Sequence, residues 1–137
     1  MLYFTRFAIM VIVLASTLVQ AESSGRVIAK CSSTGIASTE SYLIRFNRNS
    51  FSEGPTTNKP SVFIIEKYQG SKLEQSLTIL EKETKTSYNE DNGALLSLSS
   101  MSRKNQVDIE ISGRSSRIDI RSARMNVSSS NLNCVAQ

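Results

Sequence analysis

The sequence predicts a small all-β domain, an antiparallel barrel or sandwich of about eight strands. Apolar and polar residues alternate with a period of two along most of the chain, as half-buried strands require. Turn-forming Gly, Asn, Asp and Ser residues separate these segments at short, regular intervals. An immunoglobulin-like domain is disfavoured, because the chain lacks the tryptophan expected between its two cysteines.

Seven segments carry the alternation, and we expect each to form a strand: residues 27–31, 42–47, 61–68, 77–79, 96–99, 107–112 and 118–121. In the fifth of these, Leu96 and Leu98 are expected to face inward. Toward the C-terminus the inward phase changes from even positions to odd positions, up to Val127. A bulge or corner near Arg121 would produce this change and leave room for an eighth strand.

Residues 73–85 also fit a helix, because leucines recur from Leu73 at i, i+4 and i+7. The same stretch alternates as a strand does. The motif Asp91-Asn92-Gly93 is a strong signal for a tight hairpin, and such a hairpin needs a preceding strand that pairs back. We therefore favour a strand over a helix here.

The N-terminus has the features of a cleavable export signal. Arg6 precedes an uncharged apolar run at residues 7–18, and the small residues Val19 and Ala21 stand where a signal peptidase reads. The run is shorter than the roughly 20 residues of a membrane-spanning helix. We predict a signal peptide at residues 1–21 and a single domain at residues 22–137, without a membrane span after cleavage.

The two cysteines, Cys31 and Cys134, lie near the two ends of the predicted domain. In an oxidising compartment an even number of cysteines favours a disulfide, so we predict one bond that links the terminal strands. Two free thiols are the alternative. Together with the signal, this pattern predicts a secreted or periplasmic protein.

The chain has no histidine, which excludes a Ser-His-Asp triad, a Cys-His pair and the usual histidine-bearing zinc sites. The remaining acid–base candidates are carboxylates such as Glu81 with Glu83 and Asp108 with Glu110. Their spacing places each pair on one strand face, where we expect solvation rather than catalysis. We therefore expect no enzymatic activity, no cofactor and no metal site.

The candidate partner-binding residues lie in a basic stretch near the C-terminus: Ser112, Gly113, Arg114, Arg117 and Arg121. The partner that they suggest is another protein or an anionic envelope polymer. A charged outer face that discourages edge-to-edge aggregation is the alternative interpretation. Nucleic acid is disfavoured, because the C-terminal third has no aromatic residue on which bases could stack.

Two further features are informative only in part. Residues 49–59 form a long connection next to Pro60, which could present binding residues or simply join two strands. Asn126 begins an Asn-Val-Ser sequence that fits the acceptor pattern for N-glycosylation. Whether it is used depends on the source of the protein.

The layout is similar in outline to the small periplasmic inhibitors of c-type lysozymes. That resemblance implies a signal, a compact antiparallel barrel, a disulfide near the termini and a Ser-Gly-x-x-Tyr loop that enters the enzyme cleft. Here Ser112 and Gly113 keep the first two positions of the motif, but Ser116 stands where the tyrosine would be. This departure puts the inhibitory loop in doubt.

These observations predict a non-enzymatic binding module that presents loops, such as residues 49–59 and 112–117, from a disulfide-stabilised β domain. An inhibitor of an extracellular hydrolase such as lysozyme is one alternative. A structural or assembly protein of an envelope or matrix is another, because exposed edge strands can pair with other chains.

Overall fold

The computed structural model describes residues 25–35, 37–48 and 60–137, and this part of the chain consists mainly of β-strands. The elements follow in the order β1 (Arg26–Ser32), β2 (Glu40–Asn47), β3 (Val62–Gln69), β4 (Lys72–Leu80), η1 (Glu81–Glu83), β5 (Thr84–Tyr88), β6 (Leu95–Met101), β7 (Asn105–Glu110), η2 (Gly113–Ser115), β8 (Ser116–Ser122) and β9 (Asn126–Ala136). The predicted all-β class is confirmed. The predicted signal and the connection at residues 49–59 lie outside the described residues.

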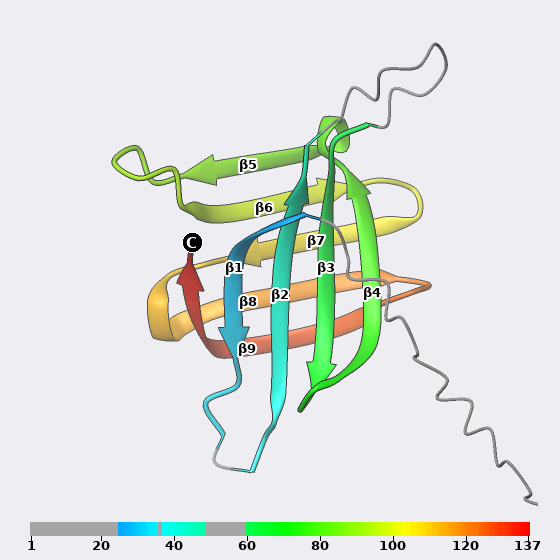
Figure 1. Cartoon of the computed structure of the whole chain (residues 1–137). Coiled ribbons are helices and arrows are strands. Elements are labelled where there is room, and N and C mark those ends of the chain that lie inside the picture. The colour runs from blue at the N-terminus through cyan, green and yellow to red at the C-terminus, as the bar shows by residue number, and fades with distance from the viewer. Residues whose placement is uncertain (1–24, 36, 49–59) are drawn as a thin grey trace, which may run out of the picture.

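All nine strands belong to one antiparallel sheet, in the order β4-β3-β2-β1-β9-β8-β7-β6-β5 (Figure 1). Strands β1 to β4 form one meander and strands β5 to β9 form a second. The two meanders join where β1 pairs with β9. Within the described residues the sheet stays open, so β4 and β5 are its two edges.

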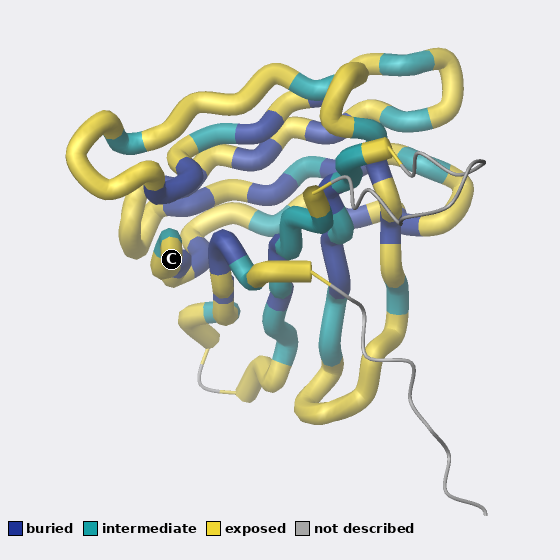
Figure 2. Tube along the Cα trace, turned by 45° about the horizontal axis from the view of Figure 1, so that its top comes forward, coloured by how far each residue is buried: buried dark blue, intermediate teal, exposed yellow. Residues whose placement is uncertain are grey.

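The two halves of the sheet lie face to face, with β1 to β4 running across β5 to β9 (Figure 1). Buried positions of both halves face the space between them (Figure 2). The core draws on every strand except β5, and its largest fully buried apolar side chains are Tyr42, Phe63, Ile44, Ile65, Ile79, Leu95, Leu98, Ile109, Ile118, Ile120 and Met125. Burying these side chains between the layers is the main stabilising contribution to such a fold.

Strand β9 turns the corner between the two halves. Its first part pairs with β8 as far as Leu132, and its last part pairs with β1 from Asn133 to Ala136. One residue before Leu132, where the register between β8 and β9 shifts, Asn131 has a φ of 58°, a left-handed conformation that asparagine tolerates better than most residues. One strand can therefore serve both layers.

A disulfide joins Cys31 of β1 to Cys134 of β9, as predicted, and closes a loop with a sequence separation of 103. The two residues are direct partners in the register, and their Cα atoms are 4.0 Å apart. The bond is therefore located at the junction of the two halves. A disulfide is consistent with an oxidising compartment.

Several sequence predictions need correction in detail. The helical alternative for residues 73–85 is wrong, because this stretch forms β4, the short turn η1 and the start of β5. Strand β5 was not predicted as a separate strand, since none of its residues is buried. Leu96 is 37% exposed, because a register shift opposite Ser87 and Tyr88 moves Leu95 into the core instead.

The change of phase near the C-terminus also has a different cause. Strand β8 continues to Ser122, and a tight turn follows before Asn126 begins β9. The four-residue turn shifts the inward phase from Ile120 to Met125 and Val127. The bulge or corner was expected near Arg121, whereas β9 passes from β8 to β1 between Leu132 and Asn133.

Candidate binding surface

The predicted binding turn between β7 and β8 is well fixed by its own hydrogen bonds. Gly113 has a φ of 61°, which a residue with a side chain rarely adopts. The buried Ser116 hydroxyl accepts a hydrogen bond from the Ser112 N–H at 2.9 Å and donates one to the Gly113 carbonyl at 2.8 Å. Arg114 is exposed in this turn and forms no ion pair with any described residue.

The other two predicted arginines lie on the outer face of β8 and are partly neutralised. Arg117 Nη2 is 2.9 Å from Asp108 Oδ2 on β7, and Arg121 Nε is 3.8 Å from Asp119 Oδ1. Four residues of a strand span about 13 Å, so Arg121 lies far from the β7–β8 turn. The structure thus brings the turn residues together but does not gather all the predicted residues into one patch.

A second group of cations, which sequence reasoning did not single out as a site, lies at the opposite end of β7 and β8. The β6–β7 turn (residues 102–105) and the β8–β9 turn (residues 122–125) have the same construction. In each, the first residue is a serine whose N–H donates to the carbonyl of the fourth residue, at 2.8 Å and 2.9 Å. The serine hydroxyl accepts hydrogen bonds from the third and fourth N–H groups, at distances from 2.9 Å to 3.3 Å. We call them the paired basic turns, because the third residue is Lys104 in one and Arg124 in the other.

The paired basic turns adjoin each other and border a pocket beside strand β4. Asn105 and Ser122 are register partners, so the turns project from the same end of neighbouring strands. The pocket has a volume of about 410 Å³, and we call it the β4 pocket. It is lined by Leu77, Thr78, Lys104, Asn105, Ala123 and Arg124.

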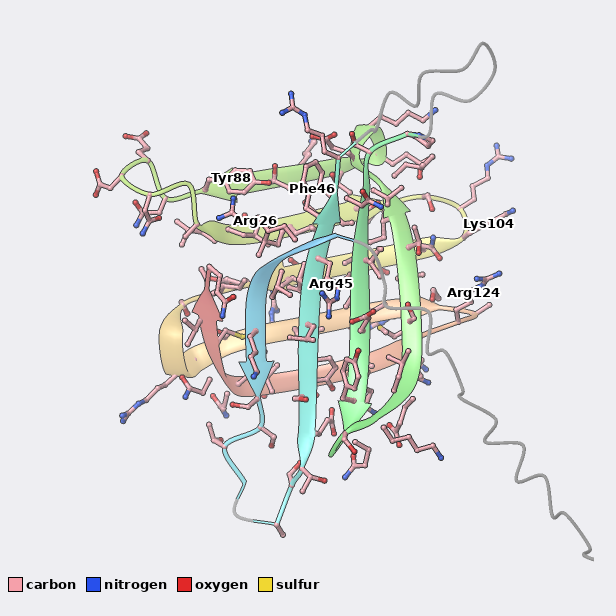
Figure 3. All side chains as sticks on the ribbon, viewed as in Figure 1. Arg26, Arg45, Phe46, Tyr88, Lys104 and Arg124 are labelled. Carbon is pink, nitrogen blue, oxygen red and sulfur yellow. A yellow bond between two sulfur atoms is a disulfide. The ribbon has the colours of Figure 1, made fainter. Side chains whose placement is uncertain are left out.

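The electrostatics of the β4 pocket favour an anion. No acidic side chain lines it, and neither Lys104 nor Arg124 forms an ion pair within the described part of the chain. Figure 3 shows both side chains on the same side of the molecule, beyond β4. Arg103 adds a third exposed cation to the β6–β7 turn.

The sequence contains a signal that could have identified each of the paired basic turns. Residues 102–104 read Ser-Arg-Lys and residues 122–124 read Ser-Ala-Arg, each between two strands. Serine at the start of a tight turn commonly accepts backbone hydrogen bonds in this way. The proximity of the two turns follows only from the strand order, which the sequence does not reveal.

A buried ionic cluster lies on the outer face of β2 and β3. Glu66 is only 1% exposed, and its Oε2 accepts hydrogen bonds from Arg45 Nε and the Tyr68 hydroxyl, both at 3.0 Å. Burial, followed by the hydrogen bond to Glu66, raises the pKa of Tyr68 above its ordinary value of 10.0. The hydrogen bond to Glu66 also raises the pKa of Arg45. We assign this cluster a structural role, because its charged groups are occupied by one another.

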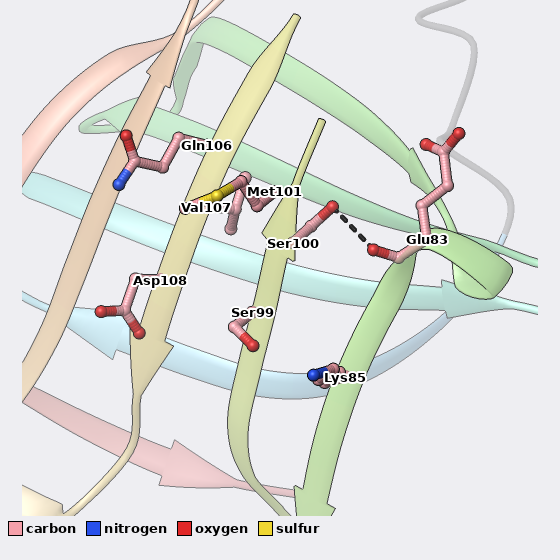
Figure 4. Close-up of a pocket in the computed structure, with 8 residues that line it drawn as sticks. All are labelled: Glu83, Lys85, Ser99, Ser100, Met101, Gln106, Val107 and Asp108. Carbon is pink, nitrogen blue, oxygen red and sulfur yellow. Dashed lines mark hydrogen bonds between the residues drawn. The ribbon is translucent and has the colours of Figure 1, made fainter. Parts of the chain in front are cut away.

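The outer face of β5 to β7 holds another hollow, of about 470 Å³, with both acidic and basic groups in its lining (Figure 4). There Ser100 Oγ donates a hydrogen bond to the Glu83 carbonyl at 3.0 Å and so ties β6 to η1. Asp108 is already paired with Arg117, and Lys85 is the basic member of the lining. The mixture of charges gives this hollow no preference for an anion or a cation.

Residues 25–35, 37–48 and 60–137 contain no group of three His, Cys, Asp or Glu side chains that could hold a metal ion. In the same ranges, no helix is both long and apolar enough to cross a membrane. The chain matches no family model, no curated protein and no solved structure. The β4 pocket and the β7–β8 turn are therefore judged on their own chemistry.

Proposed function

We propose that this chain is an exported, non-enzymatic binding module that recognises an anionic surface of another protein. The observation that carries this proposal is the pair of cations Lys104 and Arg124, which flank the β4 pocket without an ion pair among the described residues. Hydrogen bonds fix the backbone of the turns that hold them, which reduces the entropy lost on binding. The disulfide and the predicted signal support a secreted or periplasmic location.

Affinity capture from the native extracellular or periplasmic fraction tests the proposal. The bait is the wild-type domain, compared with Lys104→Glu/Arg124→Glu and with Arg114→Glu, which reverses an exposed turn arginine at the opposite end. We expect the wild type and Arg114→Glu to retain the same partner, and the double variant to lose it. A wild-type bait that retains nothing beyond what an unrelated basic β domain retains would count against a binding role.

Inhibition of an extracellular hydrolase is a second candidate, favoured by the fixed β7–β8 turn that exposes Arg114. A turn of this kind can enter an acidic cleft. The test is the activity of lysozyme and of several proteases with the domain in stoichiometric excess. Unchanged rates throughout would remove this candidate.

Assembly into an envelope or matrix structure is a third candidate, favoured by the two edges of the open sheet, which have no further strand partner among the described residues. Edge strands of different chains would then pair with each other. Light scattering over a range of concentrations tests this directly. A monomer at every concentration would argue against assembly.

A further inference from the structure

We infer that the β4 pocket is the accessible part of a groove that binds an acidic, extended segment of a partner protein by strand addition to β4. This inference rests on the proposed binding function and names the chemistry of the partner. It joins two features that lie side by side, an unprotected strand edge and a pair of cations.

The first feature is the edge itself. Within the described residues β4 pairs with β3 alone, so alternate N–H and C=O groups of β4 point away from the sheet. Proteins usually protect such edges with charges, prolines or bulges. In β4 the charged residues Lys72 and Glu74 lie at its start, where the register is irregular. Residues 75–80 carry no charge, no proline and no register shift.

The second feature is the position of the paired basic turns beside this unprotected part of the edge. Leu77 and Thr78 line the β4 pocket together with both turns. Each side chain of an added strand would lie on the same face of the sheet as the β4 residue opposite it. Side chains of the added strand that lie opposite the inward-facing Leu77 and Ile79 would therefore point toward the layer that carries Lys104 and Arg124.

The spacing of the two turns fits an extended chain. Each turn joins two neighbouring strands, and neighbouring strands are about 4.8 Å apart, so the centres of the turns are separated by about 10 Å. Strand β4 runs across this series of strands (Figure 1). Alternate residues of an extended peptide are about 7 Å apart, which the flexible Lys104 and Arg124 side chains can accommodate. Carboxylates at alternate positions would thus meet both cations.

The occupant is an acidic peptide rather than a second copy of this chain because of charge. Residues 75–80 of β4 carry no acidic side chain, so a second copy that paired through this part of β4 would bring no carboxylate to the cations. An acidic strand supplies backbone hydrogen bonds and carboxylates together. This combination is a known mode of peptide recognition, in which the backbone provides affinity and the side chains provide selectivity.

Fluorescence anisotropy with a labelled peptide tests the inference. The probe alternates aspartate and threonine over the length of β4. One control probe replaces aspartate by asparagine, and another carries N-methyl groups that block its backbone hydrogen bonds. The proteins are the wild type, Lys104→Glu/Arg124→Glu and the matched control Arg114→Glu, all checked for folding by circular dichroism.

We expect saturable binding of the acidic probe by the wild type and by Arg114→Glu, and about tenfold weaker binding by the double variant. Both control probes should bind much more weakly. Equal binding of the N-methylated probe, or an unaffected double variant, would overturn strand addition at this groove. A partner captured through Lys104 and Arg124 that has no extended acidic segment would preserve the proposed function and overturn this inference. A dimer of this chain that blocks the groove would also overturn this inference.

Discussion

The two edges of the sheet differ in how they are protected. Strand β5 is five residues long, has Lys85 near its centre and shows a register shift at Ser87 and Tyr88. Strand β4 is nine residues long, and its charges and irregularity are confined to its first three residues. The remainder of β4 includes Leu77 and Thr78, which line the β4 pocket together with the paired basic turns.

This difference shows how an open sheet can keep one edge closed to other chains and leave the other available. The charge on β5, its short length and the irregular register at its end disfavour pairing with any neighbour. The cations beside β4 instead favour one class of neighbour and repel basic segments. The predictions below test what holds the two edges in this arrangement, beginning with the largest expected effect.

Removal of the disulfide should have the largest effect on stability, because this bond links the half of the sheet that ends in β4 to the half that ends in β5. For a loop of about 100 residues, chain entropy predicts a loss of about 4–5 kcal/mol in the free energy of unfolding. The measurement is urea denaturation of the wild type and of Cys31→Ala/Cys134→Ala. Reductant should destabilise the wild type and leave the double variant unchanged. A loss below about 1 kcal/mol would contradict the role given to this bond.

The buried carboxylate of Glu66 should be the next most sensitive position. Glu66 is the register partner of Ser76, so it lies directly behind the unprotected part of β4. Glu66→Gln removes the negative charge that pairs with Arg45, and we expect the free energy of unfolding to fall by about 2 kcal/mol. This loss is smaller than is usual for a broken buried ion pair, because Arg45 keeps some solvent contact. Urea denaturation measures this loss.

Glu74→Gln is the matched control for Glu66→Gln. Its carboxylate is 3.6 Å from Lys67 Nζ but 38% exposed, so its removal should change stability by less than about 0.5 kcal/mol. Equal effects of the two substitutions would show that burial of Glu66 does not matter to the support of β4.

Tyr68 should make the stability of the fold depend on pH in the alkaline range. Its pKa is raised in the folded state, so the unfolded chain loses this proton first as the pH rises. The stability that Tyr68 contributes is therefore complete below 10.0 and declines as the pH rises from there through the higher folded pKa. Thermal unfolding at several pH values should show a shallower alkaline decline for Tyr68→Phe than for the wild type. Parallel profiles would refute this prediction.

The exposed ion pair between Arg117 and Asp108 should have the smallest effect. Both side chains are about half exposed, at 49% and 52%, so Arg117→Ala should reduce stability by less than about 0.5 kcal/mol. Binding of the acidic probe should not change, because this pair lies on the outer face of β7 and β8. Weaker probe binding by Arg117→Ala would indicate that the arginines of β8, and not the β4 pocket, receive the acidic segment.

The sequence was sufficient to predict most strands, because alternation is a local pattern. It was also sufficient to predict the disulfide, because two cysteines allow only one pairing within the chain. Burial of one face gives strands such as β7 a clear alternation, with Val107 and Ile109 inside. Strand β5 buries no residue and so has no pattern to detect. Strand β9 was hard to detect because its start is rich in serine and its buried positions change phase between Val127 and Leu132, around Asn131.

The candidate site was less accessible to sequence reasoning. Arg114, Arg117 and Arg121 are close in sequence, which made them conspicuous, yet two of them pair with neighbouring carboxylates. Lys104 and Arg124 are distant in sequence, and only the pairing of β7 with β8 brings their turns together. Their relation to β4 depends further on how the two halves of the sheet cross.

Amide hydrogen exchange with and without the acidic probe tests the inequality of the two edges most directly. At saturating probe, we predict slower exchange for alternate amides within residues 75–80 of β4 and no change within β5. The amides of β4 that already pair with β3 serve as an internal control. Protection of β5 instead, or no protection of β4 at saturation, would contradict the account.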